Sequence, residues 1–468
     1  MLVRRLALPA VFAFVAAASW LATPLATGCV AAVPPAQAAT KPNVIVILMD
    51  AQRADVLGPY GYKLRKTTPN LDKFASGGMV WENVISQNAW TVPSVASLFS
   101  GVDPQGHRTL RFQVKSRIEM DTMSLLHDTM AEQFKAGGYR TGAFIKSTVI
   151  DSSRGFSQGF DDFNIVGGKD QAWGYSAKEL NDAALPWLLE RGKEGKPFFA
   201  YLHYMDSHSP YKAPEPWYSK YKGSYAGKLT GAHVEIEEAV KAGPKPSPAD
   251  WDYLRSLYDA EIEYWDSEFG RVWTALEGAG MTKNTVVVVL ADHGEAFWEH
   301  ENIFHGNLYQ ENIHIPVIVR GPGVKAGRMK GYAQLIDVPP TLSDLAGVGK
   351  GRAWMGQSML AAMAGGAGRT DAVYSEYVEQ RAVIEPSGLK LIIGDGADKL
   401  FDLKSDPMEK NNLAVARAVD VARLRASAEA RHAMGKKVGA AYPLEAPKPL
   451  DDEQTRLLCE LGYIECPK

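Results

Sequence analysis

The sequence predicts an α/β fold with a mostly parallel, doubly wound sheet flanked by helices, followed by a small C-terminal antiparallel α+β region. Short apolar runs lack the alternation of half-exposed strands, and helical patterns separate these runs. Beyond about Gly347 the pattern changes to short strands joined by Gly, Asp and Pro turns. We therefore expect a large domain at residues 41–349 and a smaller one at 350–468.

Five apolar runs are short and continuous, which is typical of strands that are covered on both faces. They are Asn43–Met49, Thr141–Lys146, Phe198–Tyr204, Thr285–Ala291 and Ile315–Val319.

Helical spacing lies between these runs, at Leu125–Lys135 and Ala177–Glu190. The clearest helix runs from Trp251 to Leu276, where apolar residues recur at intervals of three and four. Alternating strands and helices of this kind favour parallel strands with crossover helices.

Two segments depart from this pattern. Ala213–Asp252 is polar and contains Pro, Gly and charges, so we expect a surface insertion or lid near the site. In the smaller domain we expect short antiparallel strands and then a helical tail. The strands are Ala372–Tyr377, Arg381–Ile384, Leu389–Ile393 and Lys399–Leu403.

The first 38 residues resemble a secretory signal peptide. Arg4 and Arg5 precede the uncharged run Leu6–Leu21, and Ala36-Gln37-Ala38 offers a small-x-small cleavage site. Two alternatives remain open: a lipoprotein signal that would anchor the chain through Cys29, and a retained membrane anchor. The apolar run is shorter than the ~20 residues of a spanning helix. We expect export to the periplasm or beyond the cell.

The composition is that of an ordinary globular protein, with 46% hydrophobic and 22% charged residues. The net charge of −3 gives no support for a nucleic-acid partner. Cys459 and Cys466 lie near the C-terminus and would form a small disulfide loop in an oxidising compartment, or remain two unrelated thiols. In neither case do we expect them to be catalytic.

Acidic residues and a histidine follow two of the expected strands. Asp50 ends the first strand, and Asp292-His293 ends the TVVVVLA strand. Ligands of open α/β sheets bind outside the carboxyl ends of the strands. Two carboxylates and a neutral imidazole at such an edge suit a divalent metal ion. The alternative for either acid alone is a structural role in capping the next turn.

A third element, Asn88–Gly101 (NAWTVPSVASLFSG), predicts a helix that begins near Thr91. Pro93 fits the first turn of a helix, and the free N–H groups of such an end suit an anion. Thr91 would lie where a metal lowers the pKa of its hydroxyl and an anionic ester docks. The alternative is a plain N-cap, the commoner role of Thr at such a position.

These segments resemble the sulfatase family of the alkaline-phosphatase superfamily over nearly all of the mature length. The matching segments occur in the family's order: NVIVILMDAQRADVLGPYGY, TPNLDKFASGG, TVPSVASLFSG, YDAEIEYWD, ADHGE, FDLKSDPMEKNNLA and LCELGY. The resemblance implies an alkaline-phosphatase-like fold and a metal-dependent ester hydrolase.

Site residues follow from this resemblance position by position. Asp50, Asp292 and His293 match metal ligands, and Thr91 matches the nucleophile that also contacts the metal. His208 and Lys146 match groups that contact the substrate anion. His305 stands where many relatives have a lysine. A buried structural histidine is the alternative for His208 and His305. His203 and His300 are further candidates for groups behind the ligands.

The chain also departs from the family's pattern. Thr91 replaces the Cys or Ser that becomes formylglycine, and Val95 replaces the Arg of that motif. Ala51 stands where many relatives have a second Asp ligand, and Thr148 where a histidine is usual. The methyl group on Cβ prevents threonine from yielding the same aldehyde. Water can still cleave a threonine–phosphate ester by attack at phosphorus. The chemistry of Thr91 therefore favours a phosphate or phosphonate ester as substrate over a sulfate ester. The overall sequence pattern, in contrast, favours sulfatases.

Three functions are consistent with these residues. The first is an exported, metal-dependent hydrolase of a sulfate, phosphate or phosphonate ester with Thr91 as nucleophile. The second is a phosphoglycerol- or phosphoethanolamine-type transferase of the cell envelope. The third is a non-catalytic protein that binds an anionic glycan.

We expect one divalent ion, calcium or manganese by resemblance, with zinc and magnesium as less favoured choices. The expected partner is a sulfated or phosphorylated small molecule, glycan or lipid. We expect no transmembrane domain in the mature chain.

Overall fold

A computed structural model describes most of the chain from Lys41 onward, which forms one compact unit. The described residues are 41–110, 112–114, 118–147, 149–167, 176–242, 245–394, 396–450 and 452–460. The predicted signal segment, Cys29, Thr148 and Cys466 lie outside them. Among the described residues, no helix combines the length and apolar character needed to cross a membrane.

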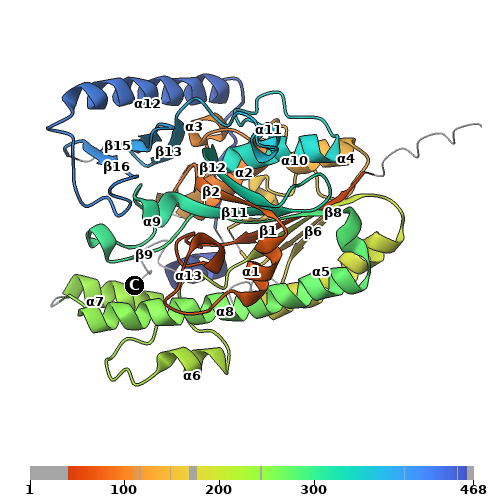
Figure 1. Ribbon diagram of the computed structural model, residues 1–468, viewed down its shortest axis with the longest axis horizontal. Helices are drawn as coiled ribbons and strands as arrows, with labels where there is room; N and C mark the ends of the chain where they lie inside the picture. Colours follow the sequence, from red (N-terminus) through yellow and green to blue (C-terminus); the bar gives the residue numbers. More distant parts are fainter. Residues whose placement is uncertain are drawn as a thin grey trace, which may run out of the picture. The chain divides into compact units, whose positions relative to one another are not determined.

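A mixed sheet of eight strands forms the centre of the molecule (Figure 1). Its spatial order is β12-β2-β11-β8-β1-β7-β5-β6. All neighbouring pairs are parallel except the two that involve β11. The strands are β1 Asn43–Met49, β2 Met79–Ile85, β5 Arg140–Ile145, β6 Asp162–Ile165, β7 Phe198–Tyr204, β8 Thr285–Ala291, β11 His314–Arg320 and β12 Gly327–Gln334. The predicted fold class is therefore confirmed.

Strand β1 shows why the sheet is buried on both faces. Its alternate residues Val44, Val46 and Leu48 join one apolar cluster, whereas Ile45 and Ile47 join the other. Because consecutive side chains of a strand point to opposite faces, a strand between two helical layers must be apolar throughout. This explains the continuous apolar run.

Helices cover each face of the sheet (Figure 1). One layer contains α2 Thr91–Ser100, α4 Met130–Ala136 and α10 Val338–Ala346. The other contains α1 Pro69–Ser76, α5 Ala177–Lys193 and α8 Pro248–Gly278. The shorter helices are α3 Pro104–His107, α9 Gln310–Ile313 and α11 Leu360–Met363.

The predicted helix Leu125–Lys135 is wrong at its start, because α4 begins at Met130. Thr129 occupies the N-cap position, and its side chain accepts a hydrogen bond from the backbone N–H of Glu132. The Glu132 carboxylate in turn accepts from the N–H of Thr129, 2.8 Å away. This capping box fixes the first turn of α4, so the apolar pair Leu125-Leu126 lies outside the helix, where both side chains are largely exposed.

The C-terminal part contains a second, antiparallel sheet of four strands. These are β13 Val373–Tyr377, β14 Gln380–Ile384, β15 Leu389–Ile393 and β16 Lys399–Asp402. Two helices follow, α12 Ala418–Gly439 and α13 Asp452–Glu460, as predicted. Phe401 and Ile392 share an apolar cluster with Ile85 and Ile313 of the large sheet region. A division of the chain at residue 349 stays a prediction.

The small remaining strands lie outside these two sheets. Strands β9 Ala296–Phe297 and β10 Ile303–Phe304 form a hairpin directly after β8. A three-stranded sheet contains β3 Phe112–Val114, β4 Ile118–Met120 and β17 Lys448–Pro449. Cys459, in α13, is disulfide-bonded. A pairing with Cys466, one of the two alternatives from the sequence, falls outside the described residues.

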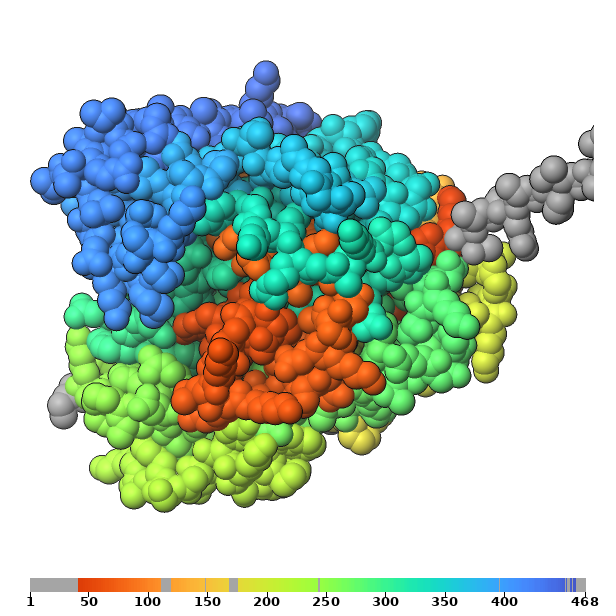
Figure 2. All heavy atoms as spheres, in the orientation of Figure 1, coloured from red at the N-terminus to blue at the C-terminus, as the bar shows by residue number. Residues whose placement is uncertain are grey.

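The segment predicted as an insertion contains two helices, α6 Trp217–Lys222 and α7 His233–Ala242, and the start of α8. Helix α6 packs along α8, and in the space-filling view the atoms of this segment form part of the molecular surface (Figure 2). In α7, in contrast, His233 and Ile236 are buried, so this helix reaches into the interior.

Candidate active site

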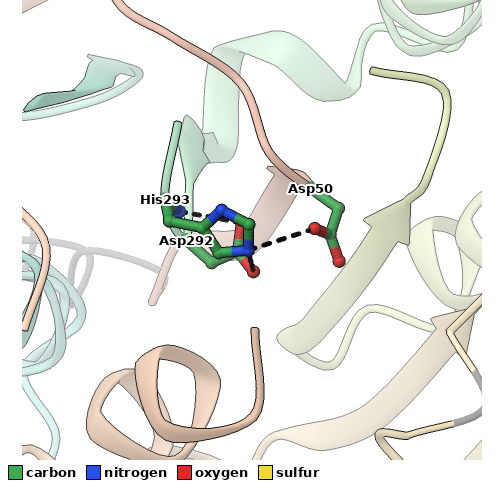
Figure 3. A group of neighbouring side chains, drawn as sticks. All are labelled: Asp50, Asp292 and His293. Carbon is green, nitrogen blue, oxygen red and sulfur yellow. Dashed lines mark hydrogen bonds and ion pairs between the residues drawn. The ribbon is translucent and has the colours of Figure 1, made fainter. Parts of the chain in front are cut away.

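Asp50, Asp292 and His293 meet at one edge of the large sheet, as predicted (Figure 3). Asp50 follows β1 and Asp292 follows β8, and these strands are parallel neighbours. One ligand atom from each of the three side chains lies within 4.8 Å of the others. All three side chains are fully buried. The carboxyl ends of adjacent parallel strands thus bring together residues that are distant in sequence.

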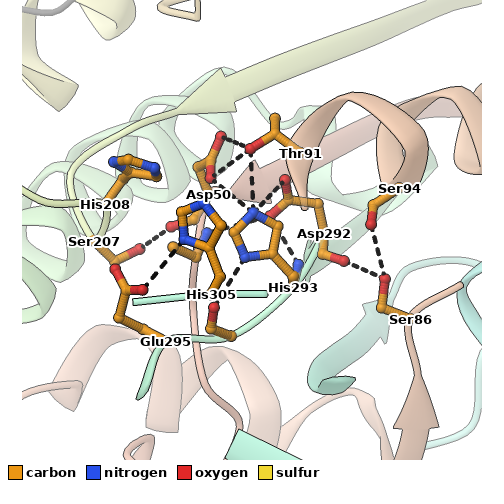
Figure 4. Close-up of polar contacts among 12 residues, drawn as sticks. Asp50, Ser86, Thr91, Ser94, Ser207, His208, Asp292, His293, Glu295 and His305 are labelled. Carbon is orange, nitrogen blue, oxygen red and sulfur yellow. Dashed lines mark hydrogen bonds and ion pairs between the residues drawn. The ribbon is translucent and has the colours of Figure 1, made fainter. Parts of the chain in front are cut away.

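Thr91 joins this group from α2 (Figure 4). Its Oγ1 atom lies 3.3 Å from Oδ1 of Asp50 and 3.1 Å from Nε2 of His293. Trp90 occupies the N-cap position, so Thr91 is the first residue of the helix and not its N-cap. The hydroxyl group is therefore directed at the carboxylate and the imidazole at the edge of the sheet.

The imidazole of His293 has a defined tautomer. Its Nδ1–H donates to the carbonyl oxygen of Gly294, 2.9 Å away, because a carbonyl can only accept. Burial and the neighbouring His305 ring lower the pKa of His293 to about 3, so the ring is neutral near pH ~7. The lone pair of Nε2 is then directed toward Thr91 and Asp50 and is able to bind a metal.

Gly294 makes this arrangement possible, because its backbone is in contact with a neighbouring segment. Its N–H donates to the carbonyl of Asn312, 2.8 Å away. A Cβ atom at this position would lie 2.1 Å from the carbonyl oxygen of Glu311. A side chain here would push the segment after β8 away and displace His293.

The two carboxylates differ in their surroundings. Burial opposes ionisation of Asp50, but the hydrogen bond from His203 and the nearby imidazoles of His208 and His293 hold its pKa below the usual range. For Asp292, burial and the negative charge of Asp50 raise the pKa well above the usual range. A cation between them would offset this repulsion.

A divalent metal ion fits these residues. Oδ1 of Asp292 accepts from the N–H groups of Ala51 and His293, at 3.2 and 2.9 Å, whereas Oδ2 is buried and has no hydrogen-bond partner among the described residues. A buried carboxylate oxygen without a partner is costly unless a cation binds it. With Asp50, Nε2 of His293 and Thr91 Oγ1, this atom completes a set of oxygen and nitrogen donors.

Strand β7 supplies a residue that directly supports Asp50. Nε2 of His203 lies 3.0 Å from Oδ2 of Asp50, and Nδ1 lies 2.9 Å from the hydroxyl of Tyr201. The carboxylate can only accept, so Nε2–H of His203 donates to it. Ser207 adds a hydrogen bond to the backbone carbonyl of Asp50, at 2.6 Å. This chain of buried groups fixes the orientation of the carboxylate.

His305 and His208 extend the group of imidazoles beyond His293 (Figure 4). The ring of His305 lies 4.5 Å from that of His293 and 5.2 Å from that of His208, measured between centroids. Nδ1 of His208 donates to the carbonyl of Ser209 at 2.6 Å, and Nδ1 of His305 lies 3.3 Å from Oε1 of Glu295. Burial lowers the pKa of both histidines, that of His305 to about 4.

Lys146 lies at the end of β5, where its backbone N–H donates to the carbonyl of His203 at 3.1 Å. Its ammonium forms an ion pair with Glu179, 2.7 Å away. Its role in binding an anion stays a prediction. His300, the other candidate, pairs with Glu311 at 2.8 Å and stacks on Tyr309.

Two departures from the sulfatase pattern have clear structural settings. Val95 is fully buried and packs in the apolar cluster between α2 and the sheet. Ala51 has a left-handed backbone (φ 57°) and donates its N–H to Asp292. Position 51 therefore contributes a backbone donor to the site instead of a carboxylate.

Sequence reasoning missed several residues of the site, among them Glu295 and Ser86. Glu295 contacts His305, and Ser86 donates to the backbone carbonyl of Asp292. Ser86 also lies 3.1 Å from the hydroxyl of Ser94, in the first turn of α2. Glu295 lies in the quoted ADHGE segment, which offered a signal for it, whereas a serine after a strand carries none.

Comparisons with known proteins identify the family of the chain. The family model described as Sulfatase matches residues 42–348, and that described as N-sulphoglucosamine sulphohydrolase, C-terminal, matches residues 298–431. A curated sulfatase of Formosa agariphila is 23% identical over 87% of this chain and 88% of its own length. The multifunctional alkaline phosphatase superfamily protein PehA of Trinickia caryophylli is 24% identical over 80% of this chain and 91% of its own.

Solved structures show the same fold. The phosphonate monoester hydrolase of Agrobacterium radiobacter superposes with a TM-score of 0.67 at 21% identity, covering 84% of this chain and 96% of that one. A second structure, of a protein in complex with its substrate D-glucosamine-2-N,6-O-disulfate, has a TM-score of 0.71 at 20% identity. It covers 85% of this chain and 99% of that one.

Proposed function

The chain belongs to the sulfatase family, and we propose that it is an exported, metal-dependent hydrolase of a sulfate, phosphate or phosphonate ester with Thr91 as nucleophile. One observation carries this proposal. The Thr91 hydroxyl lies 3.1 Å from Nε2 of His293 and 3.3 Å from Asp50, at the first residue of a buried helix. A hydroxyl with only a structural role would not need to face these groups.

Asp50, Asp292, His293 and Thr91 would hold the ion. When bound, a divalent ion lowers the pKa of the threonine hydroxyl and offsets the charge of the ester oxygens. The resemblance favours calcium or manganese. The imidazole suits manganese or zinc, and the carboxylates suit calcium or magnesium.

In the first chemical step, Thr91 Oγ1 gives its proton to a water molecule and bonds to the sulfur or phosphorus of the ester. The bond from that atom to the leaving oxygen breaks, and this oxygen takes a proton from His208 or His305. Burial keeps both rings neutral near pH ~7, but an ester anion beside them favours the imidazolium form. The N–H groups at the start of α2 and the ammonium of Lys146 are suited to contact the non-bridging oxygens.

In the second step, a water molecule attacks the same sulfur or phosphorus atom, the bond to Thr91 Oγ1 breaks, and this oxygen takes a proton back from water. The histidine that gave up its proton accepts one from this water. A phosphoryl group bound to Thr91 is readily released by attack of water at phosphorus. Release at sulfur requires direct attack at that atom, because Thr91 has no second hydroxyl on its β-carbon. This favours a phosphorus ester, whereas the curated relative from Formosa agariphila is named a sulfatase.

The experiment that tests the function is a paired assay on purified mature protein loaded in turn with Mn²⁺, Ca²⁺ and Zn²⁺. It compares an aryl sulfate, a phosphate monoester, a phosphodiester and a phosphonate ester, with Thr91→Ala as the blank. We expect turnover of a phosphorus ester. Turnover of the aryl sulfate would show a sulfatase that works without formylglycine, contrary to the release argument. Metal binding without turnover of any of the four would contradict the hydrolase proposal for these ester classes.

Export is part of the proposal and is supported by Arg4, Arg5, the apolar run and the Ala36-Gln37-Ala38 site. N-terminal sequencing of the mature protein tests it. We expect a first residue at or near Ala39. A mature chain that begins at a lipid-modified Cys29 would instead show a lipoprotein.

A further inference from the structure

We propose that His233, in the insertion helix α7, is a positioning residue that holds together the two segments carrying His208 and His305. This inference deepens the proposed function, because those two histidines are the predicted contacts of the ester anion. Four observations support it: a hydrogen bond, a ring stack, the anchoring of the insertion, and a strained backbone that the stack contacts.

The hydrogen bond connects His233 to the residue that follows His208. Nδ1 of His233 lies 2.7 Å from the hydroxyl of Ser209, and both side chains are buried. The carbonyl of the same Ser209 accepts from Nδ1 of His208 at 2.6 Å. His233 therefore contacts the residue that orients the His208 ring.

The ring stack connects His233 to the residue that precedes His305. The imidazole lies parallel to the Phe304 ring, with 3.8 Å between centroids and an interplanar angle of 13°. Phe304 has a left-handed backbone (φ 58°), which is strained for a bulky residue and persists only where surrounding contacts impose it. The stack on His233 is one such contact, and it fixes the direction in which the chain enters His305.

The insertion itself is anchored at this place. The N–H of Tyr211 donates to the carbonyl of Gly231, 2.9 Å away, and Ile236 packs in the apolar core. Gly231 has a φ of 95°, and a Cβ atom there would lie 2.6 Å from the carbonyl oxygen of Tyr211. His233 is thus held by a backbone contact before it and an apolar contact after it.

Together these contacts form a bridge from α7 to both sides of the anion site. The rings of His208 and His305 lie 5.2 Å apart, yet they belong to segments that follow different strands. Because a displacement of about 1 Å at a reacting group can lower a rate ~100-fold, the spacing of the two rings must be fixed. His233 contacts the immediate neighbour of each.

Variants that remove one contact at a time test this inference. His233→Phe keeps a ring on Phe304 and loses the hydrogen bond to Ser209, whereas His233→Ala loses both contacts. Ser209→Ala removes the same hydrogen bond from the other side. His127→Phe is the matched control, because His127 is equally buried and its ring contacts Tyr442 instead of the site.

Hydrogen exchange measured by mass spectrometry on the full chain gives a result that does not depend on catalysis. We expect His233→Phe to speed exchange in the segment 205–211 alone, and His233→Ala to speed it in 303–306 as well. The control should leave both segments unchanged. The inference would be overturned if both segments of His233→Ala exchanged at wild-type rates. It would also be overturned if exchange were accelerated equally throughout the chain.

Kinetics on the best substrate of the paired assay provide the second result. We expect kcat to fall about 10-fold to 100-fold in His233→Phe and in Ser209→Ala, with little change in KM. The double variant should be no worse than either single one, because both remove the same bond. Additive losses would contradict the bridge. If the wild type turns over none of the esters, the proposed function fails, whereas the exchange result still decides the role of His233.

Discussion

Oγ1 of Thr91 lies 3.1 Å from Nε2 of His293, although the two residues are 202 positions apart in the chain. The hydroxyl comes from the first residue of α2 and the imidazole from the end of β8. The lone pair of Nε2 is directed toward this hydroxyl because Nδ1–H is donated to Gly294. The proposed nucleophile and a proposed metal ligand are therefore in direct contact, and the effects of changing each one should differ.

Thr91→Ala should abolish turnover, with a loss of at least about 1000-fold in kcat, because the attacking oxygen is removed. Folding should stay intact, as judged by circular dichroism and thermal unfolding. Ser100→Ala is the matched control, since it removes another buried hydroxyl from the same helix. Activity retained in Thr91→Ala would rule out Thr91 as the nucleophile.

His293→Ala should reduce the metal bound per chain, measured by elemental analysis after dialysis, because the imidazole nitrogen is the only nitrogen donor of the proposed set. Asp292→Asn should act in the same direction, since Oδ2 of Asp292 has no hydrogen-bond partner in the part of the chain that the structure describes. His127→Ala, at a distant buried histidine, should bind as much metal as the wild type. Unchanged metal content in His293→Ala would place the ion elsewhere.

His203→Asn should lower metal affinity about 10-fold to 100-fold, as is usual when a residue supporting a ligand is lost. His203 donates through Nε2 to Asp50 at 3.0 Å, and an asparagine amide is too short to reach this position. His203→Gln places an amide nitrogen near that of Nε2 and should restore most of the affinity. Isothermal titration calorimetry with Mn²⁺ measures both variants, and equal affinities for the two would contradict the role of the hydrogen bond.

His300→Gln should lower stability at acidic pH and have less effect at alkaline pH. Burial lowers the pKa of His300, but the ion pair with Glu311, 2.8 Å away, outweighs it and raises the pKa above 6.5. A raised folded-state pKa means that the pair stabilises the fold below the unfolded value of 6.5, and the contribution disappears as the pH rises through the folded value.

Urea unfolding at pH ~5.5 and ~9 measures this difference, which should be on the order of 1 kcal/mol for a hydrogen-bonded pair whose side chains are 16% and 5% exposed. Glu311→Gln should remove the same pH dependence. A loss of equal size at both pH values would show that His300 acts through packing alone.

Five of the eight strands of the large sheet, β1, β5, β7, β8 and β11, could be predicted because each is a continuous apolar run. Strands β2, β6 and β12 were not predicted, because polar residues interrupt their sequences. The bounds of β1, β7 and β8 agree with the predicted runs. The start of α4 could not be predicted. Leu125 and Leu126 fit the apolar spacing of the helix, but the capping box at Thr129 sets its first residue. Apolar spacing indicates where a helix packs, and capping decides where it begins.

The centre of the candidate site was also accessible from sequence, because Asp50 and Asp292 directly follow apolar strands. His203 was harder to assign, because its ring belongs to a fully buried strand and resembles any core histidine. The role of His233 could not be predicted from the sequence, since this residue lies in a polar segment without a clear apolar pattern. Its partners Ser209 and Phe304 are brought to it only by the packing of the insertion.

The order of strands in the sheet has a consequence for synthesis of the chain. Strand β1 hydrogen-bonds to β7 on one side and to β8 on the other, so its second neighbour is complete only when Ala291 has left the ribosome. Until then, a strand that is apolar on both faces lacks one of its two partners, and its unpaired edge is prone to pair with other nascent chains. A chain released from a ribosome that stalls before Thr285 is therefore prone to aggregate. The site at Asp50 and Asp292 forms only after strand β8 has been synthesised.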